Sequence, residues 1–530
     1  MSNFGGHGKA DRNLAGCLSP LIFVGGLLII LYTTLKPFSF QFRSLILGDY
    51  LAGYEIPPSS FLDFPRNILL FVPIGFSLAA ILDQRGWPRS RIRLAVLACG
   101  FLLTLMVESL QQFLSFRQPS AADLIANTLG ALAGLACYRL WQNREATAEW
   151  LKEALIAPPK VLAALAIYAL LLLFMAYGLS SSVQYYDWDV DYRLMLGNEA
   201  TGDRQWHGSV RDLIVFDRVL ENDQVRQLLN EPELALTNNE GLLAYYPLTE
   251  GSPEPDLAGK QPSLIWLPTT EINKKEHTPQ FGGNHWLASE SAVKELSVLL
   301  QESSQLTVRL TVATAELEQG GPARIVTISE DTLLRNLTLG QEGNDLVMRF
   351  RSFLTGENGT SPQIVFPGFF TNSDPVEFVV TFDGLAIELI DSRSETAKSV
   401  EMVPGIAFYY SYIDLILNPN ISFGQVSAGT ISNWIYRLLY YICVLLPVGI
   451  LLSLPALKAW SQSYRIILIL CSLLGIPLLL ELGQIACSGL GLRPTNVVTS
   501  VLVIVIVAWV LMPLARRLIS LLTAAHARRG

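Results

Sequence analysis

The sequence predicts a polytopic α-helical membrane bundle of about eight transmembrane helices with an inserted all-β domain of the jelly-roll or sandwich type. Of the 530 residues, 51% are hydrophobic and 16% are charged, and the mean hydropathy of +0.37 is more apolar than that of a water-soluble chain. Residues 181–430 hold 35 of the 46 acidic residues but only 16 of the 38 basic ones. This acidic segment has short β-rich runs, whereas its flanks have long apolar runs.

Charge and cysteine placement exclude nucleic acid as a partner and a disulfide framework for the central segment. A nucleic-acid binder needs a basic patch that neutralises phosphates, and an acidic centre does not supply one. All six cysteines lie in or beside the apolar segments. Their spacing is not that of metal ligands, so we interpret them as small buried hydrophobic residues.

Eight apolar segments are long enough to cross a bilayer, which requires about 20 residues of helix. We interpret the first as a retained helix and not a cleaved signal, because its apolar run is long and no clean small-residue cleavage site follows. The predicted spans lie near residues 17–35, 66–83, 91–112, 121–141, 160–178, 432–454, 464–486 and 496–515.

The basic residues of the short loops predict that both termini are cytoplasmic. Tails 1–16 and 516–530 and the loops after the second, fourth and sixth spans are basic on one side, whereas the other side has few basic residues outside the central segment. We therefore expect a five-helix bundle at 17–178, an extracytoplasmic domain at 181–430 and three more helices at 432–515.

The central segment predicts many short strands separated by Gly, Pro, Asn and Asp, a pattern typical of a sandwich or jelly roll. One short helix is predicted at 223–229. The predicted strands lie at 306–312, 323–329, 345–350, 377–383 and 385–390.

Motifs spread over about 240 residues of this segment resemble the laminin-G-like, concanavalin A-like jelly-roll family. They are the run 241–248, a turn region around Asp256, and the strands at 306–310 and 377–384. Pieces at 206–220 and 423–436 both resemble the closing strand of that family. Because the first piece precedes the opening strand, the domain is either circularly shuffled or built from two partial modules.

This resemblance implies a glycan as partner of the central segment, in some relatives together with Ca²⁺, although fold alone does not set function. Aromatic faces can stack on sugar rings, but the same side chains can equally belong to the core of a sandwich, and a lone His is often structural. No acidic cluster has EF-hand spacing, so we assign no metal site and no cofactor. The candidate glycan contacts are Trp206, His207, Trp266, His285, Trp286, Tyr409 and Tyr410.

Polar residues of the second to fourth spans predict a site at the outer membrane face. Glu108 and Gln111 share one helix face, Asp123 and Asn127 share a face of the next helix, and the loop between these helices is basic. A carboxylate inside a bilayer costs a few kcal/mol, so these side chains should face the bundle. The predicted membrane site comprises Asn67, Glu108, Gln111, Arg117, Asp123 and Asn127.

Three interpretations of this site remain open. The polar side chains can lock the helices together through hydrogen bonds. They can also grip an anionic or sugar-bearing lipid head group, with Arg117 as the anion contact. The third interpretation is an enzyme that acts on a lipid-linked envelope substrate, with Glu108 or Asp123 as general acid or base, although the spans contain no His and no nucleophile beside a base.

The ordered elements of this site, from Asn67 with Pro73 and Gly75 to Asp123 with Asn127, resemble the VanZ-like family over residues 20–141. That family is named after a member associated with resistance to the glycopeptide teicoplanin, and its biochemical activity is not established. The resemblance implies an integral protein of a bacterial cytoplasmic membrane in contact with membrane lipids, but it implies no reaction.

The C-terminal spans repeat part of this pattern. Pro447 and Gly449 resemble the proline and glycine of the second span, and Glu481 precedes Arg493 much as Glu108 precedes Arg117. Counting on from Arg493 predicts Thr499 and Val503 in place of Asp and Asn, and Tyr441 replaces Asn67. We interpret 432–515 as a degenerate second copy without an intact polar site; the alternative is chance similarity among apolar helices.

Overall fold

The computed structural model describes residues 6–35, 38, 40, 60–114, 120–237, 239–248, 254–268, 280–282, 285–394, 396–414, 424–488 and 492–527. The chain divides into two compact units, Met1–Ala163 and Ala164–Gly530, and each is described by itself. Arg117 lies outside the described residues, as does Phe423 of the predicted closing strand.

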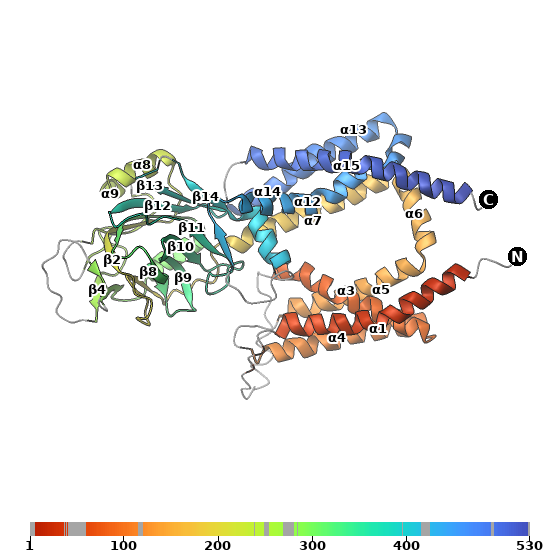
Figure 1. Cartoon of the computed structure of the whole chain (residues 1–530), viewed down its shortest axis with the longest axis horizontal. Helices are drawn as coiled ribbons and strands as arrows, with labels where there is room; N and C mark the ends of the chain where they lie inside the picture. Colours follow the sequence, from red (N-terminus) through yellow and green to blue (C-terminus); the bar gives the residue numbers. More distant parts are fainter. Residues whose placement is uncertain are drawn as a thin grey trace. The chain divides into compact units, whose positions relative to one another are not determined.

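The first unit is helical, and four of its helices, α1, α3, α4 and α5, pack side by side (Figure 1). Glycine brings two of them close together, because a Cβ added at Gly75 or Gly134 would overlap the backbone of the facing helix. Gly130 packs equally closely, since a Cβ there would overlap the backbone of Ile68. The helices are α1 Gly6–Leu35, α3 Ser60–Gln84, α4 Arg89–Gln111, α5 Ala121–Gln142 and α6 Arg144–Ile156.

The second unit contains long helices that precede and follow the β domain in the chain. Helix α13 continues through one π-helical turn, η4, into α14, so the two form one span. The elements are α7 Pro158–Val183, α12 Ile431–Ser453, η3 Pro455–Ala459, α13 Gln462–Leu470, η4 Cys471–Gly475, α14 Ile476–Ser488 and α15 Pro494–Ala527.

Eight helices among the described residues are long and apolar enough to cross a membrane, and they coincide with the eight predicted spans. Large apolar side chains remain exposed on them, including Phe174 at 67% and Trp509 at 73%. Such exposure fits contact with lipid and not with water. The chain is therefore an integral membrane protein with an inserted all-β domain.

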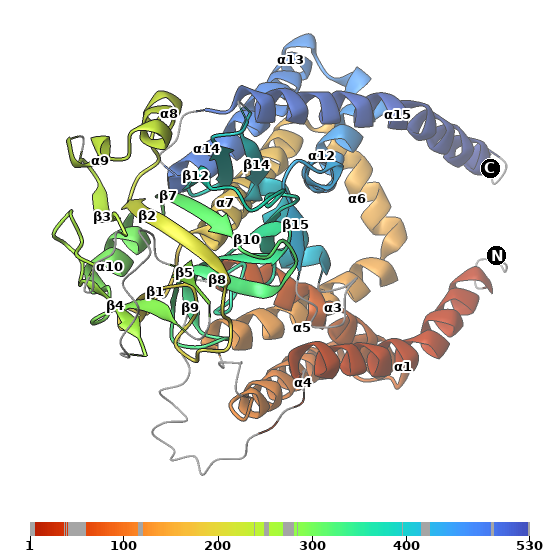
Figure 2. The same cartoon turned by 60° about the vertical axis from the view of Figure 1, so that its left-hand side comes forward.

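The β domain is a sandwich of two large sheets. One sheet has eight strands in the order β15-β11-β10-β9-β8-β1-β6-β4. The other has seven strands, in the order β14-β13-β12-β7-β2-β3 with β5 beside β2, and Figure 2 shows β2, β7 and β12 next to one another. Short helices complete the domain: α8 Asn222–Asn230, α9 Leu234–Thr237, α10 Lys294–Ser303, η1 Met402–Ile406 and η2 Tyr409–Ile413.

The strands of the first sheet are β1 Arg193–Leu196, β4 Leu264–Leu267, β6 Trp286–Ser289, β8 Gln319–Ser329, β9 Arg335–Gly343, β10 Asp345–Phe350, β11 Gln363–Phe366 and β15 Gln425–Ser427. Those of the second are β2 Gly208–Phe216, β3 Leu242–Tyr246, β5 Gln280–Phe281, β7 Leu306–Thr314, β12 Val376–Phe382, β13 Ala386–Asp391 and β14 Lys398–Glu401. Aromatic rings fill the space between the sheets, where the centroids of Phe350 and Phe382 lie 5.3 Å apart.

The predicted strands and the helix at 223–229 are confirmed, but the sequence analysis missed β9, α10 and the shorter strands β1, β4, β5, β6, β11 and β14. The early piece of the resemblance, β2, is an inner strand between β3 and β7, so a segment ahead of the opening strand completes the sheet. The late piece is wrong as a strand over most of its length. Among its described residues only Gln425–Ser427 form a strand, and α12 already begins at Ile431, because its apolar residues continue into the span.

Candidate functional site

The hairpin of α4 and α5 is built around the carboxylate of Glu108, which is 1% exposed. Its Oε2 accepts the backbone N–H of Ser120 at 3.0 Å. The Ser120 hydroxyl in turn accepts the N–H of Ala122 at 3.2 Å and so caps the N-terminus of α5. Glu108 therefore holds the first turn of α5 against the last turn of α4.

The remaining predicted residues join this hairpin to α3 and α1. Asn67 Nδ2 donates to Asp123 Oδ1 at 2.7 Å, and that carboxylate lies in the first turn of α5, where the helix dipole favours an anion. Asn127 donates to the Thr104 hydroxyl at 2.8 Å. The predicted residues that the structure describes thus lie at the ends and on the faces of helices that pack against one another.

Sequence analysis missed three partners of this site. Gln111 Nε2 donates to the backbone oxygen of Thr34 at 3.1 Å and so joins α4 to α1. Thr104 lies one helical turn before Glu108, and Ser120 directly precedes α5. Helical spacing from Glu108 could have identified Thr104, and the preference for serine at an N-cap could have identified Ser120.

A second hairpin, of α14 and α15, repeats this anchor. Glu481 Oε1 accepts the backbone N–H of Arg493 at 2.6 Å, twelve residues further on, which is also the separation between Glu108 and Ser120. Asn496 donates to Glu481 Oε2 at 2.9 Å. Arg493 therefore takes the place of Ser120, and Asn496 that of Asp123.

This geometry corrects the sequence count that took Arg493 as the counterpart of Arg117. The shared feature is a glutamate that holds the start of the next helix, so the count must begin at the glutamate. The predicted replacements Thr499 and Val503 are then wrong, because an intact polar cluster stands three residues earlier.

The second hairpin also contacts the β domain. Arg437 of α12 donates to Asn496 and, at 2.8 Å, to Glu401 Oε2 at the end of β14. Arg493 Nη2 donates to Asp383 Oδ2 at 2.7 Å. Arg437, which sequence analysis did not single out, and Arg493, which it used in the repeat comparison, thus join α12 and the α14–α15 hairpin to the sandwich.

The candidate glycan contacts occupy different environments. Trp206 is fully buried and donates its indole N–H to Gln341 at 2.9 Å, so it is wrong as a sugar platform and belongs to the core. His207 is partly exposed, and its Nδ1 lies 2.7 Å from Glu316 Oε1. The half-buried Trp266 packs on Phe281 with ring centroids 5.5 Å apart.

His285 and Trp286 are half-buried, and their Nδ1 and Nε1 atoms are buried without a hydrogen-bond partner among the described residues. Tyr409 lies in η2, where its ring centroid is 4.6 Å from that of Tyr436 at the start of α12. Tyr410 also contacts Tyr436. Within the described ranges no group of three or more His, Cys, Asp or Glu side chains is arranged to hold a metal ion.

Comparison with known proteins finds one similarity. A family model described as VanZ/LLP1 matches residues 23–142, which include the Glu108 hairpin and Asn67. No curated protein and no solved structure matches the chain. The similarity therefore concerns the helices of the first unit.

Proposed function

We propose that this chain is a cell-envelope protein whose first unit binds a sugar-bearing or anionic lipid head group, while its β domain lies outside the cytoplasm and binds a glycan. The observation that carries the proposal is the meeting of Asn67, Glu108 and Asp123 at one end of α3, α4 and α5. The similarity of this segment to VanZ/LLP1 supports an envelope role.

The chemistry of these side chains suits a hydroxylated head group. Carboxylates accept hydrogen bonds from sugar hydroxyls, and the amides of Asn67 and Gln111 can both donate and accept. Their position at helix ends lies where head groups meet a bilayer. In the β domain, the half-buried Trp266 and Trp286 supply apolar ring surface beside polar atoms for a sugar.

The experiment compares binding of a polyprenyl-phosphate-linked hexose by the full chain in nanodiscs with binding by Glu108→Gln and Asp123→Asn. We expect both variants to fold and to bind at least tenfold more weakly, whereas the control Glu149→Gln, on the exposed face of α6, binds normally. Normal binding by folded Glu108→Gln and Asp123→Asn would overturn the head-group site.

Two further readouts separate the parts of the proposal. Hydrolysis or transfer of the hexose that stops in Asp123→Asn would favour the alternative enzyme, with Glu108 and Asp123 as acid and base. An epitope inserted near residue 300 should be accessible from outside the cell. Accessibility from the cytoplasm alone would refute the extracytoplasmic placement of the β domain.

A further inference from the structure

Three arginines lie on adjacent strands of the eight-stranded sheet. Arg324 is on β8, Arg335 on β9 and Arg349 on β10. Paired residues of neighbouring strands share a face, and Arg349 pairs with Thr338, which pairs with Thr327.

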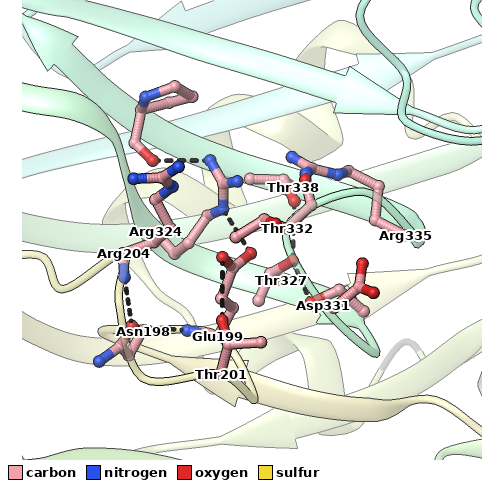
Figure 3. Close-up of polar contacts among 12 residues, drawn as sticks. Asn198, Glu199, Thr201, Arg204, Arg324, Thr327, Asp331, Thr332, Arg335 and Thr338 are labelled. Atoms are coloured by element: carbon pink, nitrogen blue, oxygen red, sulfur yellow. Dashed lines mark hydrogen bonds and ion pairs between the residues drawn. The ribbon is translucent and has the colours of Figure 1, made fainter. Parts of the chain in front are cut away.

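The other two arginines share this face. Arg324 pairs with Gly340, two residues from Thr338, and Arg335 pairs with Ser329, whose hydroxyl contacts that of Thr327 at 3.2 Å. Figure 3 shows the side chains of Arg324 and Arg335 reaching toward one another.

This face is turned away from the second sheet. Phe350, the neighbour of Arg349, contacts Phe382 of the seven-stranded sheet, and side chains alternate along a strand. An outward face is ordinarily wet, yet Arg335 is 0%, Arg324 1% and Arg349 8% exposed. The structure thus buries three guanidinium groups on the outer face of a sandwich.

Among the buried side chains of this cluster, three guanidinium groups stand against the single carboxylate of Glu199. The carboxylates of Asp331 and Glu342, whose charges also act on Arg335 and Arg349, are more exposed. The buried carboxylate of Glu199 accepts from Arg324 Nε at 3.1 Å, Gln363 accepts from Arg349 Nε at 2.8 Å, and the Thr332 carbonyl accepts from Arg335. Arg335 Nε and Nη1 are buried and have no hydrogen-bond partner among the described residues.

The electrostatics agree with this geometry. Burial and the charges of Arg324 and Arg349 lower the pKa of Arg335 to about 9, and burial lowers the pKa of Arg349 to about 10. Both groups therefore stay charged at neutral pH, and the buried charge of Arg335, whose Nε and Nη1 lack partners among the described residues, is unfavourable. An oxyanion offsets this cost, because the planar guanidinium presents paired donors to carboxylate, phosphate or sulfate oxygens.

We propose that the outer face of β8, β9 and β10 is an anion-binding site, in which Arg335 and its neighbours hold a carboxylate, phosphate or sulfate group of an acidic envelope saccharide. The saccharide as carrier rests on the proposed function, whereas the oxyanion chemistry does not.

The test is calorimetric titration of the full chain in nanodiscs with glucuronate, glucose 6-phosphate, inorganic phosphate, inorganic sulfate and glucose. We expect at least one anion to bind and glucose not to bind, with at least tenfold weaker anion binding in Arg335→Met. Arg211→Met removes an exposed arginine of β2 and should bind like the parent chain. Arg335→Met should unfold at the same or a higher temperature without ligand, since it removes a buried charge.

Each outcome is decisive. Binding of both sugar anions and free anions supports the oxyanion site and the saccharide carrier. Binding of free anions alone supports the oxyanion site and refutes the saccharide as carrier of the anion. That result does not bear on the proposed head-group site of the membrane helices. Binding of none, or unchanged binding by a folded Arg335→Met, overturns the inference; if that variant does not fold, Arg349→Gln takes its place under the same criterion.

Discussion

The α4–α5 hairpin of the first unit and the α14–α15 hairpin of the second share an anchor and differ in what surrounds it. In both, a buried glutamate accepts the N–H of the residue twelve positions later. The polar residues beside Glu108 join its hairpin to other helices of the first unit, Asp123 to α3 and Gln111 to α1. Around Glu481, Arg437 extends the network to Glu401 of the β domain.

The same hydrogen bond from a backbone N–H to a buried glutamate therefore serves two purposes. The anchor fixes the geometry of a helical hairpin, and the residues added to it decide what the hairpin contacts. In the second unit the added residues are arginines that bind the carboxylates of a sandwich, so we interpret that copy as the attachment of the β domain to its helices. The first copy is the one that we propose to bind a ligand.

The largest expected effect concerns helix crossing. A Cβ at Gly75 would overlap the backbone of Ala131, whereas a Cβ at Gly449 would meet the side chain of Val507, which can move. We expect Gly75→Ala to cost about 3 kcal/mol or more and Gly449→Ala about 1 kcal/mol. Thermal unfolding of the purified variants in detergent measures both, and equal losses would contradict this distinction between the two crossings.

Arg437→Leu should come next. It leaves the buried Asn496 and the partly buried Glu401 without the guanidinium, so we expect a loss of about 2–3 kcal/mol, at the low end for buried ion pairs because Glu401 is partly exposed. Limited proteolysis should then cleave between β14 and α12 faster than in the parent chain. Unchanged cleavage and stability would mean that Arg437 does not attach the domain.

Glu108→Gln and Glu481→Gln test the shared anchor directly. An amide oxygen still accepts the N–H, but a charge-assisted hydrogen bond becomes a neutral one, so we expect each substitution to cost about 1 kcal/mol. Denaturant unfolding in micelles provides the measurement. If only one of the two variants is destabilised, the hairpins do not share the anchor.

The smallest effect is expected for the Arg493–Asp383 pair, whose side chains are 22% and 20% exposed. A double-mutant cycle with Arg493→Met and Asp383→Asn should give a coupling energy of roughly 0.5–1 kcal/mol that falls in high salt. A coupling energy of zero would leave Arg437 as the principal link to the sandwich.

The spans and the β class of the insert follow from the sequence alone, and so does the list of polar residues that the structure brings together beside Glu108. Span length and strand alternation are local properties of an apolar run, so 121–141 predicted α5 almost residue for residue. The residues of the Glu108 hairpin were found because helical spacing fixes which side chains share a face.

Only the tertiary structure decided which distant residues meet. Neither the link from Arg437 to Glu401 nor the burial of Trp206 has a local signature, because each depends on how segments far apart in the chain pack. The alternation of β8 predicts two faces but not which one is covered, so Arg324 and Arg335 read as surface residues until strand pairing places them together. Periodicity fixes the face on which a side chain lies, and packing fixes what that face touches.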